Sequence, residues 1–153
     1  MKIIYKTRAT ATGGRSGHSQ TDDGALSIDF AQPGTGKAGN NPEQLFAAGY
    51  AACFGSALQA AAQRLKLSPT DTKTSVEVGL GQNVTGGYAL DIDITVELRG
   101  ILEDQARELI EAADRLCPED RSRSVRAMST CSRATISRGV PAGASTPYHW
   151  LDS

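Results

Sequence analysis

The sequence contains few cysteine, histidine and aromatic residues. Among 153 residues there are three cysteines and two histidines, and aromatic residues make up only 5%. Three cysteines are too few for a disulfide framework, so they indicate either thiol chemistry or simple burial. The two histidines have no cysteine or histidine at metal-ligand spacing, which argues against a zinc site.

The chain also lacks a charge excess and a long apolar run. Its formal net charge is −1 and charges of both signs are interspersed, so neither nucleic acid nor an anionic membrane is an expected partner. No apolar run approaches the roughly 20 residues of a membrane span, and Arg64 closes the longest candidate. The first residues lack the apolar core and cleavage site of a signal peptide. We therefore expect a cytoplasmic protein.

One segment, NPEQLFAAGYAACFGSALQAAAQ over residues 41–63, has a marked helical pattern. Asn41 is a good N-cap, Pro42 suits the first turn, and the Glu43 carboxylate favours the positive end of the helix dipole. The following residues are mostly apolar and carry no charge before Arg64, so the pattern predicts a helix buried on nearly all sides. Cys53 lies in the middle of this helix.

The remaining segments predict several strands and a second helix in one main domain. Alternating patterns predict strands, and a later stripe of apolar residues predicts a second helix that ends at Cys117. The expected strands cover Ile3–Thr12, Ala25–Phe30, Ser75–Leu80 and Tyr88–Leu98, and the expected helix covers Leu102–Leu116.

Two glycine-rich loops are candidate functional segments. Residues 13–17, GGRSG, hold Arg15 in what must be a tight turn. Residues 33–40, PGTGKAGN, superficially suggest a phosphate-binding loop. However, the GxxxxGK[ST] spacing is absent and Ala38 occupies the position that needs serine or threonine, so a nucleotide site is excluded.

Several of these segments resemble the organic hydroperoxide resistance (Ohr) branch of the OsmC/Ohr family of thiol peroxidases. The residues that carry the resemblance are NPEQLFAAGYAACF around Cys53, ATATGGRSGHSQTDDGALSIDF around Arg15, and GGYALDIDITVEL and EDQARELIEAADRL before Cys117-Pro118. The resemblance implies an α+β fold in which two central helices are flanked by antiparallel sheets. It also implies an intertwined homodimer with its active sites at the interface.

The resemblance assigns a role to each of four residues. Cys53 would be the peroxidatic cysteine and Cys117 the resolving cysteine, Arg15 would stabilise the thiolate, and Glu43 would orient Arg15. The substrates would be organic hydroperoxides and the reductant dihydrolipoyl groups of lipoylated proteins, with no bound cofactor or metal. From the residues alone, Cys53 and Cys117 could instead be buried structural cysteines, and Arg15 could be solvent-facing.

Some positions depart from the family pattern. The family often has histidine where this chain has Asp114 and Gly55. From residue 127 the resemblance stops, so we divide the chain into a domain at 1–126 and an atypical tail at 127–153. The tail is rich in serine, glycine and proline and predicts irregular structure, with the last family strand lost or altered.

A frameshift near residue 127 is our hypothesis for the tail. Codons for the family sequence RGNVDV, after loss of one G, can read Arg-Ala-Met-Ser-Thr-Cys, as at residues 126–131. The gene sequence tests this hypothesis. Under it, Cys131, His149 and Trp150 have no family role, and loss of a core strand would leave a sheet edge unpaired.

Three functional classes follow from the sequence. The first is an organic hydroperoxide reductase. The second is an OsmC-type peroxidase with another substrate preference, which the GGR and NPEQLF segments disfavour. The third is a non-catalytic chain, either inactivated by its tail or a binding module that reuses the fold; reaction of Cys53 with peroxide distinguishes it from the others.

Overall fold

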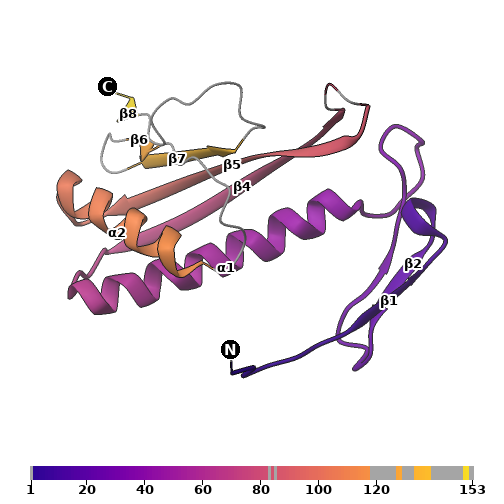
Figure 1. The fold of residues 1–153 in the computed structure, drawn as a ribbon, viewed down its shortest axis with the longest axis horizontal. Coiled ribbons are helices and arrows are strands. Elements are labelled where there is room, and N and C mark those ends of the chain that lie inside the picture. Colours follow the sequence, from indigo (N-terminus) through magenta and orange to yellow (C-terminus); the bar gives the residue numbers. More distant parts are fainter. Residues whose placement is uncertain are drawn as a thin grey trace. The chain divides into compact units, whose positions relative to one another are not determined.

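The computed structural model describes residues 2–82, 84 and 86–117, together with the backbone of strands at 127–128, 133–138 and 150–151. The chain forms two compact units, residues 1–45 and 46–153. In the first unit, β1 (Ala9–Thr12), β2 (His18–Thr21) and β3 (Ser27–Asp29) form an antiparallel sheet in the order β1-β2-β3 (Figure 1). β1 and β3 are shorter than the predicted strands Ile3–Thr12 and Ala25–Phe30, and β2 was not among the predicted strands.

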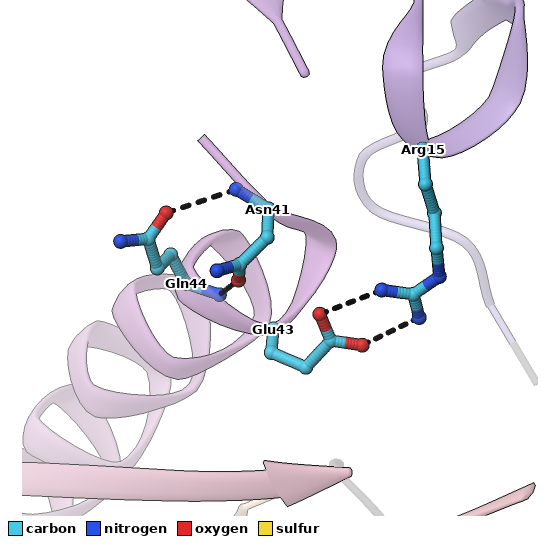
Figure 2. Close-up of polar contacts among 4 residues, drawn as sticks. All are labelled: Arg15, Asn41, Glu43 and Gln44. Atoms are coloured by element: carbon cyan, nitrogen blue, oxygen red, sulfur yellow. Dashed lines mark hydrogen bonds and ion pairs between the residues drawn. The ribbon is translucent and has the colours of Figure 1, made fainter. Parts of the chain in front are cut away.

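The long helix α1 (Pro42–Leu65) begins where the sequence predicts. The Gln44 backbone N–H donates to the Asn41 side-chain oxygen at 2.8 Å, and the Asn41 backbone N–H donates to the Gln44 side-chain oxygen at 2.9 Å (Figure 2). This reciprocal capping box satisfies two backbone donors that would otherwise lack helical partners. It fixes the first turn of α1, which carries Glu43.

The expectation that α1 is buried on nearly all sides is wrong for the single chain. Its buried residues lie on one face and are Tyr50, Phe54, Ala57, Leu58, Ala61 and Ala62. The opposite face is exposed and carries small, uncharged residues, namely Ala48, Ala52, Ser56 and Ala60. α1 therefore has two faces without charge. One packs in the core, and the described residues of the chain leave the other exposed to solvent.

In the second unit, both helices lie on one face of a sheet (Figure 1). The strands β4 (Asp71–Gln82) and β5 (Tyr88–Arg99) form the predicted antiparallel hairpin, with Val76 opposite Ile94. The helix α2 (Glu103–Leu116) follows. The core contains residues of α1, β5 and α2, and its fully buried large side chains are Phe54, Leu58, Ile94, Val96, Leu98, Leu109 and Ile110.

The prediction that the tail is irregular is wrong at β7 (Arg133–Arg138). This strand pairs antiparallel with β5, placing Ile136 opposite Ile94, so that edge of the hairpin is paired. The local sequence ATIS contains β-branched residues, which favour the extended state. Two short strands, β6 (Ala127–Met128) and β8 (Trp150–Leu151), pair parallel. Cys131 and His149 lie outside the described residues.

By length and composition alone, α1 could cross a membrane. A core helix of a water-soluble protein passes the same test, and the inner face of α1 packs into the core. This single helix is therefore not enough to indicate a membrane protein.

Candidate functional site

The turn that carries Arg15 depends on two glycines. Arg15 lies in a short 3-10 helix, η1 (Gly14–Ser16), between β1 and β2. Gly13 has φ 74°, a left-handed conformation that side chains with a Cβ rarely adopt. A Cβ at Gly17 would lie 1.8 Å from the Thr12 carbonyl oxygen, so only glycine fits there. Gly13 and Gly17 are therefore required by the tight turn that presents Arg15.

Arg15 forms a bidentate ion pair with Glu43. Its Nη2 donates to Glu43 Oε1 at 2.6 Å and its Nη1 donates to Oε2 at 2.9 Å (Figure 2). The Glu43 side chain is 13% exposed and that of Arg15 is 43% exposed. Two parallel charge-assisted hydrogen bonds fix the plane of the guanidinium, which a single contact would not do. Within the first unit, the structure thus brings together two of the four residues that the sequence singled out.

The charge of Glu43 is favoured by this pairing. The hydrogen bonds from Arg15 are the main cause that lowers the pKa of the Glu43 carboxyl, and its own backbone N–H adds to the effect. The first turn of α1 also favours a lower pKa of Glu43, because unpaired backbone N–H groups there stabilise an anion. Glu43 is therefore ionised at neutral pH and holds Arg15 as a cation in a defined orientation.

The other two residues meet in the second unit. Cys53 of α1 and Cys117, at the C-terminal cap of α2, have their Sγ atoms 3.8 Å apart and are not linked by a disulfide. They are 64 positions apart in the chain, so the fold and not local sequence brings them together. A disulfide needs an S–S distance of about 2.05 Å, so a small side-chain movement would close the bond.

The two thiols differ in exposure. Cys117 is buried at 9% exposure, whereas Cys53 is partly buried and packs against the core cluster. On α1, one turn before Cys53, the ring of Tyr50 packs edge to face against Phe46 at 5.7 Å between ring centroids. Cys53 thus combines partial solvent access with apolar and aromatic neighbours in the core cluster.

A fifth ionisable residue lies one helical turn before Cys117. Asp114 is half-buried in the last turn of α2, and desolvation raises the pKa of its carboxyl, while the charge of Arg115 acts in the opposite direction. Sequence reasoning assigned Asp114 no role. The available signal was its departure from the histidine that is common in the family at this position.

No group of three or more His, Cys, Asp or Glu side chains that could hold a metal ion occurs among the residues that the structure describes. The candidate chemistry thus rests on the two thiols and on the bidentate ion pair.

Comparison with known proteins identifies the family. The family model described as OsmC-like protein matches residues 34–136. The chain belongs to the OsmC/Ohr family. It is 39% identical over 119 residues to the organic hydroperoxide resistance protein OhrB of Bacillus subtilis, covering 75% of this chain and 87% of that protein.

Other members of the OsmC/Ohr family give the same result. The organic hydroperoxide resistance protein of Xanthomonas axonopodis pv. citri is 39% identical over 122 residues, covering 76% of this chain and 85% of that protein. The crystal structure of the organic hydroperoxide resistance protein OsmC from Legionella pneumophila superposes with a TM-score of 0.72 at 41% identity. It covers 76% of this chain and 88% of that one. The predicted family and its α+β fold are therefore confirmed.

Proposed function

We propose that this OsmC/Ohr protein is a cysteine-based peroxidase that reduces organic hydroperoxides to alcohols. The observation that carries the proposal is the pair of unlinked thiols, Cys53 and Cys117, with sulfur atoms 3.8 Å apart. The names of its relatives as organic hydroperoxide resistance proteins support the choice of substrate class.

The reaction has two thiol steps. The Cys53 thiolate attacks the O–O bond of the hydroperoxide, because the thiolate and not the thiol is the nucleophile. One oxygen stays on sulfur as a sulfenic acid, and the other leaves with the alkyl group and takes up a proton to form the alcohol. The Cys117 sulfur then attacks the sulfenic sulfur, forming the disulfide and releasing water.

Arg15 and Glu43 have supporting roles in this proposal. A guanidinium near the Cys53 thiolate favours its charged form and can donate to the departing oxygen. Glu43 fixes the orientation of Arg15 through the two hydrogen bonds of 2.6 and 2.9 Å. Because the pair is partly exposed, we expect it to organise the site more than it stabilises the fold.

The remaining parts of the proposal concern substrate and partners. The apolar and aromatic residues that pack with Cys53 in the core cluster suit organic hydroperoxides better than hydrogen peroxide. Dihydrolipoyl groups of lipoylated proteins would reduce the disulfide, and the location would be cytoplasmic. A homodimer would cover the exposed face of α1 formed by Ala48, Ala52, Ser56 and Ala60. Size-exclusion chromatography with light scattering tests the dimer.

Reaction with cumene hydroperoxide tests the function. One equivalent added to the reduced protein should yield the alcohol and a disulfide that peptide mapping assigns to Cys53 and Cys117. Cys53→Ser should consume no peroxide, and Cys117→Ser should accumulate a sulfenic acid that dimedone traps. Unreacted thiols in folded protein would refute the peroxidase proposal. A greater rate with hydrogen peroxide would favour an OsmC-type peroxidase of other preference.

A further inference from the structure

Asp114 occupies a position that is unfavourable for a carboxylate. It lies in the last turn of α2, where unpaired carbonyl groups favour a cation, and it is half-buried. Burial raises the pKa of its carboxyl. Its neighbour Arg115 also lies 4.0 Å from Glu111, so its charge is shared with a second carboxylate. A residue that conflicts with its local surroundings in this way is often explained by function.

The helical spacing makes Asp114 a neighbour of Cys117, the proposed resolving cysteine. The Cys117 backbone N–H donates to the Ala113 carbonyl at 2.9 Å, so the helical path of α2 extends to Cys117. Residues three apart on a helix are neighbours on its surface, with Cβ atoms about 5–6 Å apart. Asp114 and Cys117 have this relation, and the Cys117 sulfur in turn lies 3.8 Å from that of Cys53.

Building on the proposed peroxidase function, we propose that the Asp114 carboxylate accepts the proton of the Cys117 thiol when the disulfide forms. The carboxylate takes the proton as the Cys117 sulfur attacks the Cys53 sulfenic sulfur. The S–S bond forms, the S–O bond breaks, and the departing hydroxide receives the proton from Asp114 and leaves as water. The carboxylate is thereby restored and no net proton is exchanged with solvent.

Two physical arguments support this role. Cys117 is buried, so bulk water is poorly placed to take its proton, and the half-buried Asp114 is the carboxylate one helical turn away. A carboxylate whose pKa is raised by burial is also a stronger base than an exposed one, which improves proton transfer from a thiol.

The test resolves the two steps in a Cys131→Ser background by rapid quenching and mass spectrometry. Asp114→Asn keeps the shape of the side chain and removes its basicity. We expect it to slow disulfide formation by about 10²-fold, which is the lower end of the range of rate factors for general acid–base catalysis. The rate of sulfenic acid formation in the same experiment is the internal reference. Asp114→His, whose imidazole accepts a proton, should restore most of the rate. Glu108→Gln, which removes an exposed carboxylate of α2, is the matched control and should leave both steps unchanged.

The alternatives give different results. A carboxylate that acted only as a fixed negative charge would disfavour the thiolate, so Asp114→Asn would speed disulfide formation. A purely structural side chain would give equal losses in Asp114→Asn and Asp114→His. Either result, or an unchanged rate in Asp114→Asn, overturns the proposal.

A second assay separates this proposal from the peroxidase function. With Ellman's reagent, Cys53 forms a mixed disulfide and Cys117 then displaces the second coloured thiolate, which requires no peroxide. If cumene hydroperoxide does not react, the function fails but this assay still decides the role of Asp114. The second release should be slowed in Asp114→Asn and restored in Asp114→His; equal rates in all three proteins would overturn the proposal.

Discussion

Oxidation of the Cys53–Cys117 pair should stabilise the protein by an amount that follows from the fold. The two residues are 64 positions apart, so a disulfide between them would close a loop of that length in the unfolded chain. The loss of chain entropy on closing such a loop corresponds to about 4 kcal/mol at 25 °C. The sulfur atoms are already 3.8 Å apart, so we expect little of this gain to be lost as strain in the folded state.

The assay is urea unfolding of the reduced protein and of protein oxidised with one equivalent of cumene hydroperoxide, both in a Cys131→Ser background. With a slope of about 2 kcal/mol per molar urea, the midpoint should rise by about 2 M on oxidation. Cys117→Ser is the control and should show no rise. If the oxidised protein carries the mapped disulfide but unfolds at the same or a lower urea concentration, the inferred proximity of the two thiols is refuted.

Three further predictions concern the core, the turn and the ion pair. Phe54→Ala should lower the free energy of unfolding by about 3–5 kcal/mol, because Phe54 is fully buried. The control Gln59→Ala, on the exposed face of α1, should change it by less than about 0.5 kcal/mol. Urea unfolding measures both. Gly17→Ala should abolish peroxide reduction while the second unit remains folded by circular dichroism, because its Cβ would clash with a carbonyl oxygen; full activity would contradict this. The Arg15–Glu43 pair should add at most about 1 kcal/mol to the free energy of unfolding at pH values above 4.5, the usual pKa of a glutamate. This contribution is lost as the pH falls through the lowered pKa of Glu43. The greater stability of the native protein over Glu43→Gln should therefore vanish in acid.

Local sequence signals were sufficient to predict much of the fold. The capping residues before Glu43 predict the start of α1 because the hydrogen bonds involved are local, between Asn41 and Gln44. The strict alternation in β4 and β5 predicts their hairpin, since one face of each strand must meet the core. The strand β7 was missed because its short β-branched segment is surrounded by glycine, serine and proline, and pairing with β5 overrides this weak signal.

The candidate site was predictable only through the family resemblance. Arg15 and Glu43 are 28 positions apart, and Cys53 and Cys117 are 64 positions apart. No local sequence signal predicts either contact, because tertiary packing alone brings the residues together. The exposed face of α1 was mispredicted because low charge indicates an apolar surface but does not say what covers it.

The last prediction separates stability from function at Asp114. Its folded-state pKa is raised above the usual 3.8, so the native state favours the protonated form, and the associated stability is lost as pH rises through the folded pKa. Asp114→Asn should therefore raise the free energy of unfolding at neutral pH, by about 0.3–1 kcal/mol from the helix dipole alone, and this gain should shrink as pH falls toward 3.8. Urea midpoints at both pH values measure the effect. A variant that is less stable at both would mean that the carboxylate makes a net favourable contact. A variant that is more stable yet slower in disulfide formation would mean that Asp114 lowers the stability of the fold and serves the reaction of Cys117.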